Sequence, residues 1–322
     1  MAPDVQPSRV GLGILLGLAA SLAFAMSGTF ARPLFAAGWT PGAAVFWRVT
    51  CAAVLLLPVG VWVMRGRLRD VVAEWRTLVG FGALAVAIAQ LMYFAAVSRI
   101  SVSVALLLEY MAPVALVLLA WVRTRHAPSR LVLAGTLTSV VGLFCVLDLT
   151  GARLDALGVT FGLLAMVGAA AYFVIGARPT RLHPLALPGF GLPIGAVVLG
   201  LAILVGALPY SAPLVDVELM GSLVPWWVPL AVIVVCATAL AYGLGVAGIA
   251  LMGERLSSFV SLSEVLFAGL VAAVVLGEQP SWMQLLGGAL IIGGVVMIRQ
   301  ATGEAPAGIP ALPDEWEAAE EH

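Results

Sequence analysis

The sequence predicts an all-α integral membrane protein with ten transmembrane helices, arranged as two inverted repeats of five helices each. Three observations predict this fold: an apolar composition, ten apolar runs of spanning length, and a similarity between the two halves of the chain. The 322 residues are 62% hydrophobic and only 10% charged, with a mean hydropathy of +1.10. Soluble domains carry about 25% charge, so this chain has too little polar surface to cover a globule in water.

The ten apolar runs define the elements in order, because a bilayer core of about 30 Å requires about 20 apolar residues per helix. We expect helices at residues 11–31, 42–64, 78–98, 101–122, 131–149, 157–177, 185–207, 225–251, 256–276 and 282–298. The longest connection is the loop 208–224. Residues 1–10 are expected to form a cytoplasmic N-terminal segment, and the acidic residues 299–322 a disordered cytoplasmic tail.

Arginine sets the expected orientation, since all 16 basic residues are Arg and none is Lys. If the N-terminus is cytoplasmic, the segments on that side hold 12 Arg, and the opposite loops hold only Arg32, Arg99 and Arg153. Cytoplasmic loops are enriched in basic residues, so this distribution predicts that both termini are cytoplasmic. The expected location is the cell (plasma) membrane, where membrane lipids surround the multi-pass chain.

Two repeats, residues 11–149 and 157–298, are indicated by matches between the halves. Three residues of each half match at an offset of 155: Ser103 with Ser258, Leu107 with Leu262, and Glu109 with Glu264. Because five is odd, the second repeat must enter the membrane in the opposite orientation. Inverted repeats are common in transporters that expose a midplane site to each side in turn. A duplicated scaffold that moves nothing would show the same pattern.

Several function classes are disfavoured by the composition. There is no basic patch with interleaved aromatic residues, so nucleic acid is not an expected partner. Cys51, Cys145 and Cys236 are widely spaced within apolar runs, which indicates neither a disulfide framework nor a metal site. The sequence has no Gly-x-x-x-x-Gly-Lys loop for nucleotide phosphates. We therefore expect no cofactor and no coupling to ATP.

Ionisable residues inside a bilayer cost about 2.5–3.5 kcal/mol each on insertion scales, so each requires an explanation. At a rise of about 1.5 Å per residue, Arg48, Gln90 and Glu109 lie roughly 10–12 Å from the outer ends of their helices and can share one layer. Glu264 lies about 12 Å from the inner end of its helix. The two carboxylates are therefore expected near the midplane, where the inverted repeat relates them.

Two interpretations apply to each charged group. Arg48 and Glu109 either neutralise each other as a pair that fixes helix packing, or recognise a zwitterion through its carboxylate and its amine. Glu264 has no basic partner at its depth, and a bilayer disfavours its charged form. We hypothesise that Glu264 exchanges a proton during transport. The structural alternative is a protonated carboxyl that bonds a neighbouring helix.

Pro113 has no N–H to donate to the carbonyl of Glu109, so it is expected to kink the fourth helix beside that carboxylate. The kink belongs either to a transport site or to simple packing. Four tyrosines within or near the spans are candidates for substrate binding, because a buried hydroxyl needs a partner: Tyr93, Tyr110, Tyr172 and Tyr242. Tyr110 and Tyr242 are the stronger candidates, since Tyr93 alternatively belongs to the interfacial aromatic belt.

The tenth helix carries four small residues, Gly287, Gly288, Gly293 and Gly294. Small residues allow helices to approach closely inside a membrane. We expect these glycines to be structural, either within the chain or at the face of a homodimer.

Motifs in the second half resemble a known family. The segment Val275-Leu276-Gly277-Glu278, followed by Gln284-Leu285-Leu286-Gly287 and Leu290-Ile291, resembles the closing motif of EamA repeats in the drug/metabolite transporter superfamily. The resemblance covers about residues 11–298 and includes both repeats. It implies ten helices, a central cavity and the efflux of amino acids or similar small metabolites.

A branch of that family is suggested by the first half. Arg48 follows an aromatic pair, and the segment Glu109-Tyr110-Met111-Ala112-Pro113 has a Glu-x-x-x-Pro pattern. Both look like the threonine/homoserine exporter branch. Second repeats of the family usually have Pro directly after the equivalent of Glu264, whereas here the residue is Val265. This departure puts the bend of the ninth helix in question.

The expected function is secondary transport, by alternating access at a midplane cavity, that exports a small metabolite such as an amino acid or derivative. One alternative is a membrane-embedded lipid-modifying enzyme. It would need paired aspartates or an intramembrane His, whereas Asp148 stands alone and no His lies at depth. A non-transporting membrane sensor is the other alternative, and it predicts no substrate-dependent flux.

Overall fold

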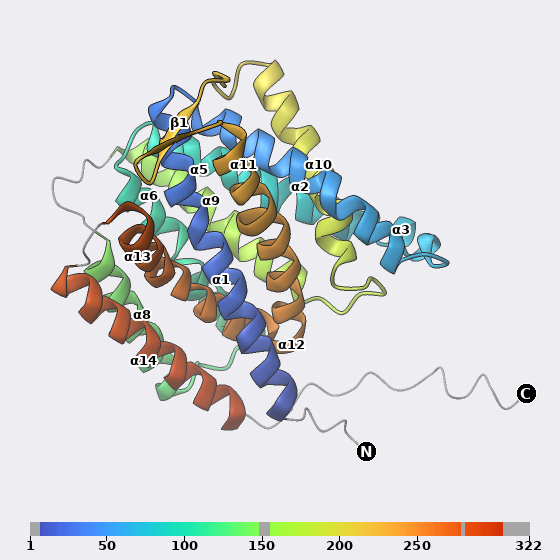
Figure 1. The fold of residues 1–322 in the computed structure, drawn as a ribbon. Helices are drawn as coiled ribbons and strands as arrows, with labels where there is room; N and C mark the ends of the chain where they lie inside the picture. The colour runs from blue at the N-terminus through green and yellow to red at the C-terminus, as the bar shows by residue number, and fades with distance from the viewer. Residues whose placement is uncertain (1–6, 148–154, 278–280, 305–322) are drawn as a thin grey trace, which may run out of the picture.

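The computed structural model describes residues 7–147, 155–277 and 281–304, and most of them are helical (Figure 1). The first half contains α1 (Pro7–Ala36), α2 (Pro41–Val63), α3 (Leu68–Ala73), α4 (Trp75–Gly80), the π-helical η1 (Phe81–Ile88), α5 (Ala89–Val97), α6 (Val102–Glu109), α7 (Ala112–Thr124) and α8 (Arg130–Val146). The second half contains α9 (Ala156–Gly176), α10 (Ala186–Leu204), β1 (Val217–Leu219), β2 (Ser222–Val224), α11 (Trp227–Val234), the π-helical η2 (Val235–Leu240), α12 (Ala241–Ser261), α13 (Ser263–Leu276) and α14 (Trp282–Glu304).

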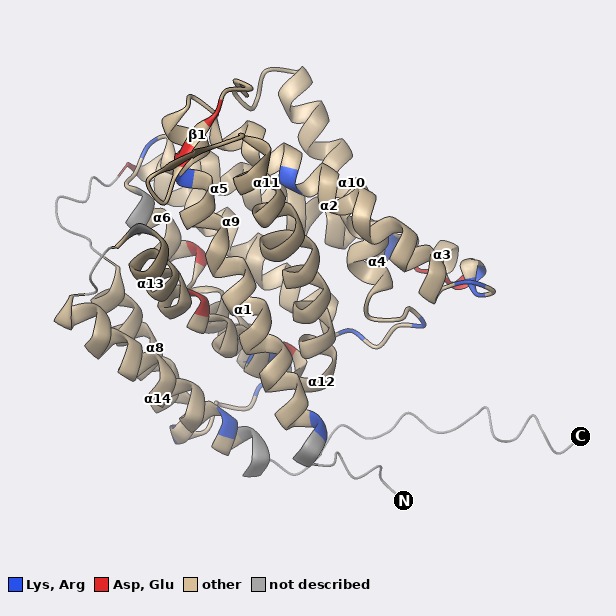
Figure 2. Ribbon diagram, viewed as in Figure 1, with Lys and Arg blue, Asp and Glu red and all other residues tan. Residues whose placement is uncertain are grey.

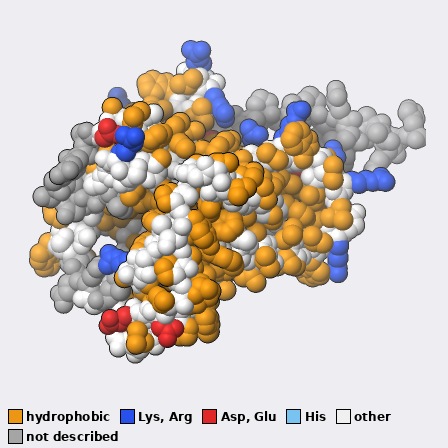
Figure 3. All heavy atoms as spheres, turned by 90° about the horizontal axis from the view of Figure 1, so that it is seen from above, with side chains coloured by type: hydrophobic (Ala, Val, Ile, Leu, Met, Phe, Trp, Pro, Cys, Tyr) orange, Lys and Arg blue, Asp and Glu red, His pale blue; other side chains and the backbone are white. Residues whose placement is uncertain are grey.

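Helices suited to a membrane dominate the described chain. Eight spans are long and apolar enough to cross a bilayer, and two further apolar helices, Arg130–Val146 and Ser263–Val275, are shorter. Hydrophobic side chains cover most of the face seen in Figure 3, and most charged residues lie at helix ends and in loops (Figure 2). The protein is therefore a multi-pass membrane protein.

Several helix boundaries differ from those expected. α1 is longer than the expected 11–31, and α14 continues to Glu304 instead of ending at 298. The start of the expected disordered tail is thus helical, while residues 305–322, like 1–6, lie outside the described residues. The run Trp227–Ser261 crosses the expected boundary between the eighth and ninth helices. Within it, Gly253 breaks the helical path with φ 77° and ψ 171°.

A small hairpin shows that the expectation of an all-α chain is wrong in one detail. β1 and β2 pair antiparallel within the expected loop 208–224, with Val217 opposite Val224. Met220 and Gly221 connect the strands with φ 52° and 74°. Two consecutive positive φ values suit the tight turns that match the twist of a hairpin. A three-residue strand is too short to leave a strong alternating pattern in the sequence.

Local signals in the sequence fix where several helices begin. Thr40, Ser101, Ser129 and Asp155 precede α2, α6, α8 and α9, and each side chain accepts a hydrogen bond from the backbone N–H three residues later. Such N-caps satisfy one of the four backbone donors that a helix start leaves without a partner. Pro41 adds a preorganised φ to the first turn of α2.

The helices pack in pairs that join the two halves of the chain. α1 lies against α12 and α13, α9 lies against η1, α5 and α6, and α2 lies along α10. α8 and α14 lie side by side (Figure 1). The starting end of α1 and the final end of α14 lie at the same end of the molecule (Figure 1). The two halves therefore interleave and do not form separate domains.

Glycines allow close approaches between helices, and α8 and α14 are one such pair. A Cβ on Gly142 would come within 2.6 Å of the carbonyl oxygen of Gly287, and one on Gly135 within 2.8 Å of that of Gly294. Gly288 faces Leu266, while nothing lies within 4 Å of a Cβ on Gly293. Three of the four α14 glycines that could have marked a homodimer face thus pack inside the chain.

Candidate functional site

Both intramembrane glutamates lie where a helix is interrupted. Glu109 is the last residue of α6, and Tyr110 and Met111 separate it from α7. Pro113 occupies the first turn of α7, where its missing N–H removes no helical hydrogen bond. Glu264 is in the first turn of α13, directly after a turn at Leu262. Broken helices of this kind build substrate and ion sites in many transporters.

The second interruption forms without proline, because the residue after Glu264 is Val265. Serine hydroxyls bond to backbone carbonyls one turn back: Ser261 to Ser258 at 2.7 Å, and Ser263 to Val260 at 2.7 Å. Such bonds compete with the helical N–H donors for the same carbonyls and bend or end helices. The run of serines therefore accounts for the break that the missing Pro puts in question.

Arg48 reaches from α2 towards α1. Its Nη1 donates a hydrogen bond of 2.7 Å to Ser27 Oγ. Its Nε is buried and has no hydrogen-bond partner among the residues that the structure describes. A buried guanidinium donor without a partner costs free energy, so this atom is available to an incoming acceptor such as a carboxylate.

The charges of Arg48, Glu109 and Glu264 interact with one another across the centre of the helix bundle. Within the described chain, no ion pair shorter than 4.0 Å joins Arg48 to either glutamate. The direct Arg48–Glu109 pair considered from the sequence is therefore absent here. One guanidinium faces two carboxylates, which leaves one negative charge uncompensated among these three groups. A proton or a cationic substrate group can supply that compensation.

All four tyrosines singled out from the sequence lie around these charges. Tyr110 faces Glu264 closely enough to donate a hydrogen bond to its carboxylate. Tyr93 lies within electrostatic range of Glu109. The rings of Tyr172 and Tyr242 meet edge to face, with centroids 5.7 Å apart. The Tyr172 hydroxyl is buried and has no hydrogen-bond partner, so it adds a second polar atom available to a ligand.

We call Arg48, Glu109, Glu264 and the four tyrosines the central polar cluster. Several residues that contact this cluster were not singled out from the sequence. Ser27 accepts a hydrogen bond from Arg48. Phe24 and Phe81 pack on Tyr242 with centroids 5.2 Å and 6.1 Å away. Ser27 could have been found from the sequence, because a guanidinium at membrane depth requires an acceptor. Phenylalanines in apolar helices are too common to mark the others.

Gln90 is the candidate whose role in a substrate site stays a prediction. It lies half-buried on α5, and no hydrogen bond or charge interaction joins it to Arg48 or the glutamates within the described chain. Arg48, Glu109, Tyr110 and Glu264 are also half-buried.

Metal chemistry is not suggested by the residues that the structure describes. Among them, no three His, Cys, Asp or Glu side chains are grouped so that they could hold an ion. The three cysteines are free and half-buried. The cluster offers instead a cation, two carboxylates and phenolic hydroxyls, which are groups suited to binding a small charged molecule.

Family comparison decides the class of this membrane protein. The EamA-like transporter family model matches residues 11–148 and 156–300. The chain belongs to the EamA-like transporter family. The two matched stretches correspond to the two halves that interleave in the fold, and together they contain every member of the central polar cluster.

Two relatives of this EamA-like chain are named as transporters. An uncharacterized transporter of Archaeoglobus fulgidus is 31% identical over 234 residues, which cover 71% of this chain and 78% of that protein. The uncharacterized inner membrane transporter YicL of Salmonella typhimurium is 26% identical over 224 residues, covering 67% and 69%. A solved crystal structure shares the fold with a TM-score of 0.70 at 20% identity, covering 91% of this chain and 99% of that one.

Proposed function

We propose that this protein is a secondary transporter that exports a small amino acid or derivative from the cytoplasm, as in the threonine/homoserine exporter-like branch of the family. The observation that carries the proposal is the central polar cluster, in which Arg48 faces two carboxylates at two helix interruptions. Membership of a transporter family supports it. An amino acid carries the charges that complement this cluster.

Ten spans in two inverted repeats, 11–149 and 157–298, are the architecture we propose. The eight long spans, the two shorter apolar helices and the break at Gly253 are compatible with ten crossings. Packing supports the inversion. α1 contacts the third and fourth spans of the second half, at η2–α12 and α13, and α9 contacts the third and fourth spans of the first half, at η1–α5 and α6. The third span of each half contains a π-helical segment, η1 in the first half and η2 in the second. These equivalences are the ones that a twofold axis in the membrane plane produces.

The binding step follows from the free polar atoms. Arg48 Nε–H donates a hydrogen bond to the substrate carboxylate, and the guanidinium keeps its hydrogen bond to Ser27. The substrate amine lies between Glu109 and Glu264, where it supplies the missing positive charge. The Tyr172 hydroxyl bonds a remaining polar group. Each contact uses either a polar atom that is not hydrogen-bonded in the substrate-free protein or a charge that is not balanced there. Binding therefore requires little rearrangement of the protein.

Proton exchange at Glu264 provides the coupling in this proposal. When the substrate leaves, a proton on Glu264 takes the place of the amine at that carboxylate. The protonated, substrate-free cluster then has no net charge, because Arg48 balances Glu109, whereas the cluster with a bound zwitterion keeps one net negative charge. Export in exchange for protons follows. The excess of Arg in one set of loops supports a plasma-membrane orientation with both termini cytoplasmic.

Flux measurements in liposomes test this function. Purified protein is reconstituted and loaded with radiolabelled amino acids, first pooled and then singly, and efflux is followed with and without an inward proton gradient. We expect at least one amino acid to leave faster than from protein-free liposomes, with acceleration by the gradient. The matched control is Arg48→Gln, which we expect to abolish efflux. No efflux of any amino acid, or equal efflux with Arg48→Gln, would refute the proposal.

A further inference from the structure

A long apolar groove lies on the outside of the bundle, away from the central polar cluster. It is bounded by α2, by residues 183–185 before α10, and by the continuous run of η2 and α12, and encloses about 650 Å³. Its walls include Leu56 and Val59 of α2, and Leu240, Leu244 and Leu251 of the other side. A volume of about 300–1,000 Å³ is typical of a ligand site. The walls exclude a polar ligand along most of this length.

The groove has the length of a lipid chain. Its wall runs from Val235 to Leu251, which is roughly 24 Å at a rise of about 1.5 Å per residue. One leaflet of a bilayer core is about 15 Å thick, half of the whole. An acyl chain can therefore lie along the groove over its full depth in one leaflet.

One end of the groove is polar. His183 lies there, next to Leu185, whose N–H donates to His183 Nδ1 at 3.2 Å. A neutral ring that accepts at Nδ1 carries its hydrogen on Nε2. Nε2 has no protein partner within the described chain and His183 is exposed, so this N–H is available as a donor at the mouth of the groove.

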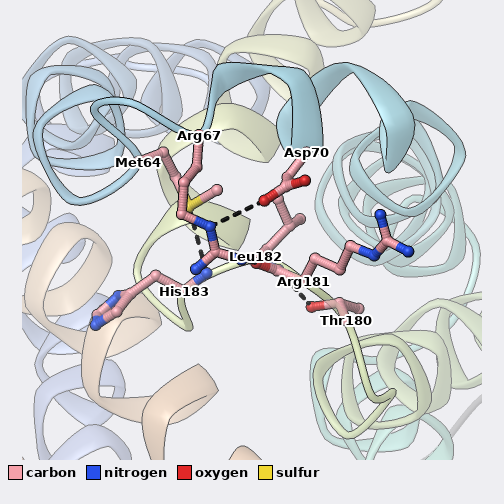
Figure 4. A network of polar contacts seen from close by, with 7 residues as sticks. All are labelled: Met64, Arg67, Asp70, Thr180, Arg181, Leu182 and His183. Atoms are coloured by element: carbon pink, nitrogen blue, oxygen red, sulfur yellow. Dashed lines mark hydrogen bonds and ion pairs between the residues drawn. The ribbon is translucent and has the colours of Figure 1, made fainter. Parts of the chain in front are cut away.

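Arginines lie in the two segments next to this end of the groove. The backbone N–H of His183 contacts Met64 Sδ at 3.5 Å, and Arg67 Nη2 donates to the carbonyl of Arg181 at 2.9 Å (Figure 4). These contacts join the loop 64–70 to the loop 180–183. Arg67 also pairs with Asp70 at 2.9 Å but stays 59% exposed, which leaves guanidinium donors unused.

A second, smaller pocket lies in the segment that Arg67 joins to the loop 180–183. It encloses about 480 Å³ and is lined by Arg67, Arg69 and Asp70 together with Gly66 and Leu68. The two arginines exceed the single carboxylate, so the pocket keeps a net positive charge. In Figure 4 the Arg67 guanidinium lies on the His183 side of the network, whereas that of Arg181 points away. Arg67 and Arg69 therefore form the positive end of the groove, to which the neutral His183 adds an N–H donor.

An aromatic residue marks the membrane surface at the same level. Trp62 is 62% exposed, and the Arg65 guanidinium lies 5.2 Å from the centre of its ring. Trp and Arg at the ends of spans anchor helices at the interface with the headgroups. Trp62 is one turn beyond the groove residue Val59. The positive end of the groove is thus at headgroup height, and the apolar part is at acyl-chain depth.

We infer that this groove binds an anionic phospholipid, with one acyl chain between α2 and α12 and the phosphate at Arg67, Arg69 and His183. Charge complementarity selects an anionic headgroup, because basic pockets beside membrane helices bind such lipids. The apolar wall selects a lipid over a free phosphate, which would leave the groove empty. The site is separate from the substrate cluster, so the inference does not depend on which solute is carried.

Native mass spectrometry of the full-length protein tests the headgroup. Phosphatidylglycerol and phosphatidylcholine with identical chains are added to the delipidated protein, and bound adducts are counted. We expect phosphatidylglycerol to bind preferentially. Arg67→Gln with Arg69→Gln should reduce the preference about fivefold for each charge removed. The control is Arg123→Gln with Arg130→Gln, which removes the same charge from exposed positions elsewhere and should leave the preference unchanged.

A second variant tests the acyl chain and keeps the charges. Ala247 lines the groove, so Ala247→Phe fills it, whereas Ala134 is exposed on α8 outside it. A phosphatidylglycerol with a photoreactive diazirine in its chain should label residues 235–251 in the wild type and in Ala134→Phe, but not in Ala247→Phe. Equal binding of the two headgroups, equal labelling of both Phe variants, or labelling confined to other helices would overturn the inference.

Discussion

Glu109 and Glu264 lie on opposite sides of breaks in two different helices: Glu109 is the last residue of α6, before its break, and Glu264 is in the first turn of α13, after its break. The two carboxylates therefore meet the helix ends with opposite polarity. Their shared interaction with Arg48 makes the charge of each depend on the other.

Arg48 is expected to bind the substrate carboxylate. Arg48→Gln should weaken substrate binding about 10- to 100-fold, since a hydrogen bond to a charged group contributes about 1.5–3 kcal/mol. Ser27→Ala removes only the acceptor that orients Arg48 Nη1 and should weaken binding less. Isothermal titration in detergent measures both. A Ser27→Ala effect as large as that of Arg48→Gln would show that Arg48 acts through packing and not through the ligand.

Glu264 is expected to carry the coupled proton. Glu264→Gln mimics the protonated carboxyl permanently, so efflux should lose its dependence on the proton gradient and on external pH. The control is Glu218→Gln, which removes a carboxylate from the exposed hairpin and should keep the dependence. The measurement is the initial efflux rate over a series of pH gradients. A Glu264→Gln protein with unchanged pH dependence would exclude the proton role.

Much of the site could be predicted because charge at membrane depth is rare. Arg48, Glu109 and Glu264 stand out in apolar runs, and the structure places them within interaction range. The Glu-x-x-x-Pro pattern located the break after Glu109. The break before Glu264 was not predictable in the same way, since it depends on serine hydroxyls bonding carbonyls one turn back. Serines are tolerated in straight helices too, so sequence alone does not separate the cases.

Features that depend on contacts between distant segments were also beyond the sequence. The break at Gly253 is not one of these features, because it falls between the expected helices 225–251 and 256–276, where Glu254 and Arg255 interrupt the apolar run. The polar end of the groove requires Arg67 to meet the Arg181 carbonyl across 114 residues of sequence. Neither loop alone shows a pattern typical of a binding site. Tertiary packing decides such positions, and the local sequence only permits them.

Tyr172 allows binding to be separated from stability. Its hydroxyl is buried without a partner, and such a group costs about 1–3 kcal/mol. Tyr172→Phe should therefore leave the thermal midpoint of the substrate-free protein unchanged or raise it, while weakening substrate binding. Tyr210→Phe is the control, since Tyr210 accepts a hydrogen bond of 3.0 Å from Trp47 at the surface. Retained affinity in Tyr172→Phe would remove this hydroxyl from the site.

Two glycines of α14 provide a matched test of the α8–α14 packing. A Cβ on Gly287 would meet Val146 Cγ2 at 2.7 Å and Cys145 Cβ at 2.9 Å, whereas one on Gly293 meets nothing within 4 Å. Gly287→Ala should lower the free energy of unfolding by about 1–3 kcal/mol through overpacking. Gly293→Ala should raise it by up to about 1 kcal/mol, because Ala favours the helix. Thermal unfolding in detergent measures both. Equal shifts in the two variants would mean that α8 and α14 separate easily, and that the close approach does not hold this pair of helices together.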